Sequence, residues 1–402
     1  STSRGLGDVY KRQREGRCFE MKLRALLPLM LCALLLASCR EGSALGEIEL
    51  PETLKVTAQL PEGYPAEVTA YNLSWYEADE RVAIDTFMHA EPQEREEQAT
   101  GPIFRTYTES FIEHLNIYAG VSHGGMDYGY YTPGGADYSE VMKERDTLKH
   151  YLRRQQPWEC INTDLTPRAR GNGSMGEAGQ ENLGFMSYDD ALGELEDRLA
   201  LFPGHELIRG EAHTAGLLNQ NRDIFNRNTT QWSSDTVSKS FTKDDEYYYF
   251  EFREVLDGIP FCNAQWAEST FGESGGGSLP SIHAIYNKDG LIELHAGSMV
   301  EPGEAISTEP IIPPEEALKV YVDEYSKAIH FENSEVISLE LNYLILADSK
   351  GLYARPAWVL TTAIEKKAGQ GDSTSDFDYT DYGVTAVSAY SGVILERETD
   401  MR

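Results

Sequence analysis

Apolar and polar residues alternate in several short stretches of this chain, and this period of two limits much of it to half-buried β-strands. Residues 54–60 and residues 111–121 alternate in this way. Residues 282–296 read as a hairpin around the turn Asn287-Lys288-Asp289-Gly290. Further strands are expected at residues 67–73, 247–255, 336–346, 357–364 and 384–395. The sequence therefore predicts many antiparallel strands joined by turns.

Two clear helix patterns interrupt these strands. Ser187 is placed to cap a helix whose apolar residues step by three and four until Pro203 ends it. Pro313 and Pro314, followed by two glutamates, start a second helix, because proline and acids suit a helix N-terminus. A weaker helical pattern covers residues 77–88.

Each of the two clear helices precedes a run of strands, which suggests a duplication. We expect an α+β fold of tandem helix-plus-antiparallel-meander units with an N-terminal β-rich region. The two units cover residues 187–300 and 311–402, and the N-terminal α+β region covers residues 54–169. Residues 170–186 are rich in glycine and poor in apolar side chains, so we expect a linker there.

Residues 21–39 have the pattern of an export signal. A short basic start precedes an apolar run too short to span a bilayer, and small residues precede Cys39. This looks like a bacterial lipoprotein signal, which implies that residues 21–38 are removed and that Cys39 carries the lipid. Residues 39–53 would then be a tether on the extracytoplasmic face of the cell membrane. An ordinary secretory signal or a short membrane anchor is the alternative.

Residues 1–20 precede the start methionine of this signal. Residues 8–13 read Asp-Val-Tyr-Lys-Arg-Gln, which looks like the translated end of a sequencing transposon. We therefore interpret residues 1–20 as an artefact of sequencing or assembly.

The chain is strongly acidic, with 66 Asp and Glu against 35 Lys and Arg and a formal net charge of -31 at pH 7. Because the signal is basic, its removal makes the remaining chain more acidic still. Such a surface is repelled by phosphate backbones and by anionic lipid headgroups. We therefore expect no nucleic-acid partner, and we expect membrane contact only through the lipid at Cys39.

Two cysteines, Cys160 and Cys262, follow Cys39. Outside the cytoplasm they could form a disulfide. They could equally be separate buried thiols, because a single pair offers no spacing pattern. Both interpretations stay open.

The last predicted strands resemble known families. Residues 354–360 read Ala-Arg-Pro-Ala-Trp-Val-Leu, and residues 384–394 alternate around a turn at Gly392. This pattern is similar to PepSY-like units and to YycH- and YycI-type extracytoplasmic regulators of Gram-positive bacteria. The whole layout also resembles uncharacterised lipoproteins of gut clostridia. The resemblance implies a helix on a small antiparallel sheet, regulation by contact with a protein partner at the cell surface, and no catalytic residues.

Residues 272–276 read Gly-Glu-Ser-Gly-Gly and fit the pattern of a serine hydrolase at Ser274. A strand rather than a helix is expected after Ser274, which does not suit a nucleophile elbow. His213 precedes Ser274 by too few residues for the two barrels of a trypsin-like protease. We therefore interpret the stretch as a flexible loop and expect neither enzyme activity nor a cofactor.

Candidate metal ligands are few. The chain has no H-E-x-x-H or paired C-x-x-C motif. His283 and His295 flank the predicted turn, but a loop of even length pairs positions whose numbers sum to an odd value. We therefore expect these two imidazoles on opposite faces, unless an odd loop or a bulge brings them together.

The acidic stretch near the C-terminus is the main candidate for binding a cation. Its carboxylates could supply oxygen ligands for Ca²⁺, although their order departs from that of an EF-hand. A solvated acidic loop is the alternative. The residues concerned are Asp372, Asp376, Asp378 and Asp381.

Tyrosines gather at residues 128–131, where Gly129 suggests an exposed loop. We therefore expect Tyr128, Tyr130 and Tyr131 to form a contact surface for a protein partner. Three functions follow as hypotheses. The chain is a lipid-anchored protein that binds or regulates a partner by contact, a solute- or cation-binding lipoprotein, or a serine hydrolase that uses Ser274. We favour the first because the motifs for catalysis are incomplete.

Overall fold

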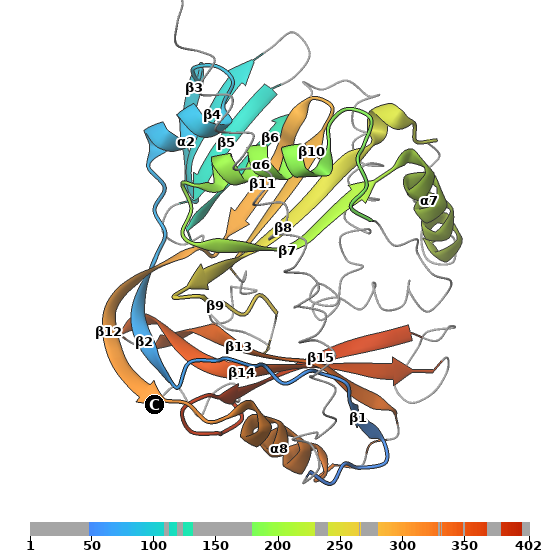
Figure 1. The fold of residues 1–402 in the computed structure, drawn as a ribbon. Helices are drawn as coiled ribbons and strands as arrows, with labels where there is room; N and C mark the ends of the chain where they lie inside the picture. The colour runs from blue at the N-terminus through green and yellow to red at the C-terminus, as the bar shows by residue number, and fades with distance from the viewer. Residues whose placement is uncertain are drawn as a thin grey trace, which may run out of the picture. The chain divides into compact units, whose positions relative to one another are not determined.

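A computed structural model shows two large β-sheets (Figure 1). Both sheets belong to the unit formed by residues 50–402. The structure describes residues 48–107, 112–118, 124–131, 179–229, 240–264, 266, 280–328, 330, 332–348, 350–367 and 379–395.

The first sheet has nine strands in the order β3-β4-β5-β6-β11-β10-β8-β7, with β9 also paired to β8. All of these pairings are antiparallel. The strands are β3 (Glu94–Gln98), β4 (Gly101–Tyr107), β5 (Ile112–Tyr118), β6 (Gly125–Tyr131), β7 (His205–His213), β8 (Tyr247–Leu256), β9 (Ile259–Pro260), β10 (Ser281–Asn287) and β11 (Gly290–Gly297).

Two helices, α2 (Glu80–Phe87) and α6 (Tyr188–Leu199), lie across one face of the nine-stranded sheet (Figure 1). Their apolar residues share one core with the inward-facing residues of the sheet. Asp79 caps α2 and Ser187 caps α6, and each side chain accepts a hydrogen bond from a backbone N–H of the first turn. The predicted helix after Ser187 is therefore confirmed.

The chain between β7 and β8 holds α7 (Ala215–Thr229) and a short 3₁₀-helix, η3 (Lys243–Asp245). Residues 179–186 of the expected linker lie against this end of the nine-stranded sheet. Gly179 bridges Ala212, and the backbone N–H of Leu183 donates to the hydroxyl of Tyr248 over 2.7 Å.

The second sheet has six strands in the order β1-β13-β14-β2-β12, with β15 also paired to β14. The pairing of β1 with β13 is parallel, and the others are antiparallel. Helix α8 (Pro314–Tyr325) begins at the prolines that predicted it, and it packs on β14 and β15. The strands are β1 (Leu54–Val56), β2 (Glu67–Trp75), β12 (Val300–Pro310), β13 (Ser334–Asp348), β14 (Gly351–Lys366) and β15 (Tyr379–Ser388).

Contacts between β8, β9 and β13 join the two sheets. The residue after β9, Phe261, is 1% exposed and bridges Tyr343 of β13. Arg253 of β8 forms an ion pair with Glu340 of β13 over 2.9 Å. Apolar residues of β2, β13 and β14 complete a core around Phe261.

The expected tandem helix-plus-meander units are wrong. In the part of the chain that the structure describes, four α-helices accompany fifteen strands. Strands β7 to β11, which follow α6, complete a sheet that begins with β3 to β6, while β13 to β15, which follow α8, join β1, β2 and β12. Local alternation identifies strands but carries no information about pairings such as β6 with β11, which lie far apart in sequence.

Candidate functional site

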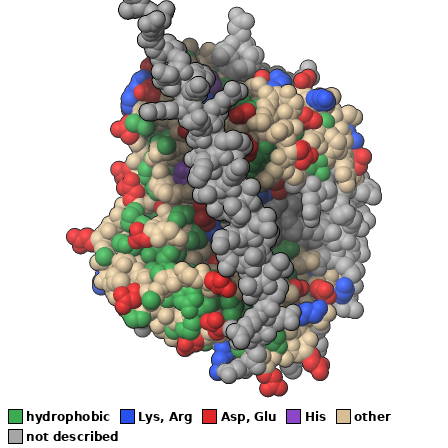
Figure 2. All heavy atoms as spheres, in the orientation of Figure 1, with side chains coloured by type: hydrophobic (Ala, Val, Ile, Leu, Met, Phe, Trp, Pro, Cys, Tyr) green, Lys and Arg blue, Asp and Glu red, His purple; other side chains and the backbone are tan. Residues whose placement is uncertain are grey.

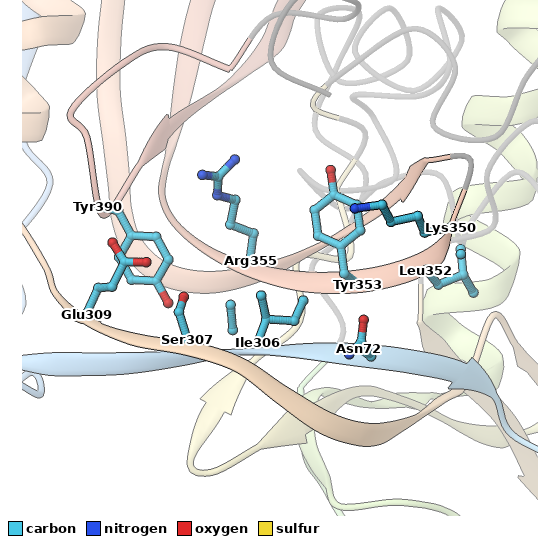
Figure 3. A pocket seen from close by; sticks show the side chains of 11 residues that line it. Asn72, Ile306, Ser307, Glu309, Lys350, Leu352, Tyr353, Arg355 and Tyr390 are labelled. Carbon is cyan, nitrogen blue, oxygen red and sulfur yellow. The ribbon is translucent and has the colours of Figure 1, made fainter. Parts of the chain in front are cut away.

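A cavity of about 470 Å³ opens on the six-stranded sheet where β14 changes partner (Figure 3). Residues 352–354 of β14 pair with β2, and residues 357–366 pair with β15. The cavity lies beside Arg355, between these two pairings. Its lining comes from β2, β12, the turn before β14, the start of β14 and the segment after β15, and consists of Ala70, Asn72, Ile306, Ser307, Glu309, Lys350, Gly351, Leu352, Tyr353, Arg355 and Tyr390.

Prolines and a glycine account for the irregular sheet around the cavity. Pro356 has no backbone N–H for a continuous ladder, and β14 changes partner at that point. Pro302 and Gly303 lie in β12, whose register against β2 shifts twice before Ser307. Because β12 is an edge strand, it tolerates these breaks.

Two basic side chains, Arg355 and Lys350, line this cavity. Acidic side chains are spread over the face of the molecule shown in Figure 2. In Figure 3 the Arg355 side chain lies between those of Tyr353 and Tyr390, and Lys350 extends along Tyr353. A guanidinium presents a planar set of N–H donors that fits a carboxylate.

Hydroxyl groups and a carboxylate line the other end of the cavity. The Tyr390 hydroxyl donates to the carbonyl of Val68 over 3.0 Å. Burial raises the pKa of Tyr390 to about 12, and the charge of Glu309 adds to this rise, whereas Ser307 and Arg355 oppose it. Tyr390 is therefore a neutral phenol at physiological pH.

The described lining residues thus offer cations, hydrogen-bond donors, a carboxylate acceptor and two aromatic rings, but neither histidine nor cysteine. Their chemistry suits reversible binding of a small polar anion. Pockets of this size commonly hold small molecules.

Sequence reasoning missed this cavity because its residues come from four separate segments. One usable signal was the pair Arg355-Pro356 inside an otherwise apolar strand. A charged residue followed by proline is unusual in a central strand and marks an interruption of the ladder.

The structure describes few of the sequence-predicted site residues. Asp381 lies in β15 opposite Ile364, and its carboxylate accepts the Tyr382 N–H over 3.0 Å. Among the described residues, no group of three or more His, Cys, Asp or Glu is arranged to hold a metal ion. Cys39, Cys160, Ser274, Asp372, Asp376 and Asp378 lie outside the described residues.

Cys262 is a free, buried thiol. Its Sγ donates to the carbonyl of Ala264 over 3.3 Å, and burial raises the pKa of this thiol to about 11. Because Cys160 lies outside the described residues, its pairing with Cys262 stays a prediction.

The expected exposed loop of tyrosines is wrong. Residues 125–131 form β6 inside the nine-stranded sheet, and Tyr128 is 1% exposed. The hydroxyl of Tyr128 donates to Glu113 over 3.2 Å. Gly125 allows β6 to lie close to β11, because a Cβ there would lie 2.2 Å from the carbonyl oxygen of Ala296. Tyr128 therefore offers no surface to a partner, and a contact role for Tyr130 or Tyr131 stays a prediction.

His283 and His295 lie on the same face of the sheet, contrary to our expectation for a regular hairpin. Tyr286 pairs with Leu291 but Ile285 pairs with Glu293, so β11 has one extra residue, Ile292. This bulge puts His283 directly opposite His295. A bulge is one of the two exceptions named above that bring the two imidazoles to the same face.

No family model matches this chain, and no curated protein sequence matches it. Among solved structures, the chain is similar to an uncharacterized protein from Eubacterium rectale ATCC 33656, with a TM-score of 0.54 and 13% sequence identity. The similarity covers 87% of this chain and 92% of that one. At this level of identity it shows a shared fold alone. The resemblance to PepSY-like units and clostridial lipoproteins stays a prediction.

Proposed function

We propose that this protein is an extracytoplasmic, lipid-anchored binding protein whose ligand is a small saccharide that carries a carboxylate. The cavity of the six-stranded sheet is the proposed site. The observation that carries the proposal is that Arg355, Lys350 and two tyrosines line one cavity of a strongly acidic chain.

Each part of the cavity matches one part of such a ligand. The guanidinium of Arg355 and the ammonium of Lys350 would hold the carboxylate, and hydrogen bonds to charged groups are the stronger kind. Tyr353 and Tyr390 would pack against the C–H face of a sugar ring, since tyrosine combines an apolar body with a polar end. Asn72, Ser307 and Glu309 would donate to and accept from the sugar hydroxyls.

We favour solute binding over regulation by contact because Tyr128, the centre of the expected contact surface, is buried. The hydrolase hypothesis draws no support from the cavity, and Ser274 lies outside the described residues.

Replacing Arg355 by glutamine should weaken binding of D-glucuronate by about tenfold to a hundredfold, because a hydrogen bond to a charged group contributes about 1.5–3 kcal/mol. Isothermal titration of the full chain measures this loss. The matched control is Arg81→Gln, since Arg81 lies on α2 and pairs with Asp85 and Glu91 away from the cavity. Equal affinity of the wild type and Arg355→Gln would contradict the proposal.

The lipid anchor is a second part of the proposal. It rests on the signal pattern of residues 21–39. Cells that express the chain should incorporate an alkyne-tagged palmitate into it. Cys39→Ala should abolish the label and release the protein from the membrane fraction, whereas Cys262→Ala should retain the label. A labelled Cys39→Ala chain would rule out the anchor at this position.

A further inference from the structure

A row of ionisable side chains crosses the face of the nine-stranded sheet opposite the helices. It contains Arg209 of β7, Glu251 of β8, His283 of β10, His295 of β11 and Asp127 of β6, each directly opposite the next. These residues alternate along their strands with the apolar residues of the core, so they share the other face. The glutamate side chain is 1% exposed, and the His295 side chain is 43% exposed.

The two histidines at the centre of the row have nearly parallel rings. The ring planes of His283 and His295 are 27° apart, and the centroids are 6.3 Å apart. His283 Nε2 lies 3.2 Å from the hydroxyl of Ser281. A Cβ on Gly297 would lie 3.0 Å from His295 Nε2. Because Ser281 and Gly297 are opposite each other in the sheet, both Nε2 atoms face the same pair of residues.

The other nitrogen of each ring is held by a neighbour. Asp127 bonds to Nδ1 of His295. The hydroxyl of Tyr249 lies 2.7 Å from Nδ1 of His283, and Glu251 lies 3.8 Å from the same atom. A carboxylate that orients one ring nitrogen while the other binds is the usual arrangement around a metal-binding histidine.

Two buried glycines lie beside the Nε2 side of the histidine pair. Gly297 and Gly125 lie opposite each other beside Ser281, and neither carries a side chain. At Gly125 a Cβ would lie 2.2 Å from the carbonyl oxygen of Ala296, which excludes any larger residue. Neither glycine therefore places a Cβ in the space beside the two Nε2 atoms.

We infer that His283 and His295 form a binding site for a divalent transition-metal ion such as Zn²⁺, with Nε2 of each ring as ligand. The hydroxyl of Ser281 and solvent would complete the coordination. Two nitrogens bound tetrahedrally at about 2.1 Å lie about 3.4 Å apart. The His295 ring must tilt toward His283 to bring the nitrogens to this separation, and the exposed fractions of its side chain (43%) and of Asp127 (29%) permit the bonded pair to move together. This site lies on the other sheet from the cavity and is independent of the proposed saccharide binding.

Calorimetric titration of the full chain with Zn²⁺ tests the site. We expect one ion per chain, and a loss of affinity of at least tenfold in His295→Gln. Asp127→Asn should lower the affinity for Zn²⁺ by about tenfold to a hundredfold, because it keeps the His295 ring but removes the carboxylate that orients it. Zn²⁺ should also raise the melting temperature of the wild type, because the ion binds only the folded chain. It should leave the melting temperature of His295→Gln unchanged.

His330→Gln is the control, since that ring stacks on Tyr325 beside the other sheet and should leave Zn²⁺ binding unchanged. His295→Gln changes a partly exposed side chain, and an unaltered melting temperature without metal shows that it is folded. Absence of Zn²⁺ binding, or equal binding by the wild type and His295→Gln, would overturn the inference.

Discussion

Replacing Trp358 by alanine should lower the free energy of unfolding by about 3–5 kcal/mol, the largest loss that we expect from one side chain. Trp358 is 0% exposed in β14, and its indole N–H donates to the carbonyl of Ile312 over 2.9 Å. Its ring also meets Tyr64 edge-on, with centroids 5.4 Å apart. The substitution removes this packing and leaves the carbonyl without its donor. Urea unfolding followed by circular dichroism measures the loss.

Two variants calibrate this result. Trp358→Phe keeps an aromatic ring but lacks the N–H donor. Its free energy of unfolding should therefore lie between those of the wild type and Trp358→Ala. Val82→Ala changes a side chain that is 48% exposed and should stay within about 0.5 kcal/mol of the wild type. A loss below about 1 kcal/mol in Trp358→Ala would show that this sheet is not packed around Trp358.

The second large effect is a dependence of stability on pH that originates at Glu254. This residue is 2% exposed, and its carboxyl accepts the Val300 N–H over 3.1 Å. Burial raises the pKa of Glu254 to about 8, and the hydrogen bond from Val300 opposes this rise. The folded chain therefore holds a proton that the unfolded chain loses near its ordinary pKa of about 4.3.

Since the folded state binds more protons between these two pKa values, stability falls as pH rises from about 4.3 to about 8. Glu254→Gln keeps a carbonyl acceptor and carries no charge. It should match the wild type within about 1 kcal/mol at pH 4 and exceed its stability by about 3–5 kcal/mol above pH 8.

Urea titrations of both chains across this pH range measure the difference. Glu304→Gln, an exposed substitution on β12, should show no such divergence. A constant difference between the wild type and Glu254→Gln at all pH values would mean that Glu254 is ionised in the folded state.

Elements with strong local signals could be predicted from the sequence. Helix α6 begins after the capping Ser187, and α8 begins at Pro314, because capping and proline preferences act within one turn. The strand at residues 247–255 and the hairpin around Asn287 were also predicted, since alternation and a short turn are local features. The strand β7 and the helix α7 carry weaker patterns and were missed.

Sheet membership could not be predicted, because it depends on contacts between distant residues. Asp127 of β6 lies beside His295 of β11, 168 residues later, and Thr69 of β2 bonds to Thr308 of β12, 239 residues later. Nothing in a local pattern selects such partners. A helix followed by strands therefore looked like a repeat, although the strands belong to two sheets.

Both candidate sites depend on irregular points in these sheets. One extra residue, Ile292, reverses the face on which His295 lies relative to His283. The change of partner at Pro356 and the register shifts of β12 create the cavity that Arg355 lines. Bulges and ladder interruptions recur beside functional sites because they re-aim side chains.

The central claim is that the cavity beside Arg355 binds a carboxylate-bearing saccharide, and a paired titration tests it most directly. D-Glucuronate and D-glucose differ in a carboxylate at one carbon, so their affinities for the full chain isolate the contribution of that group. We predict saturable binding of D-glucuronate at one site per chain and an affinity for D-glucose at least tenfold lower. Equal affinity for the two sugars, or no binding of D-glucuronate, D-galacturonate or N-acetylneuraminate at millimolar concentration, would contradict the claim.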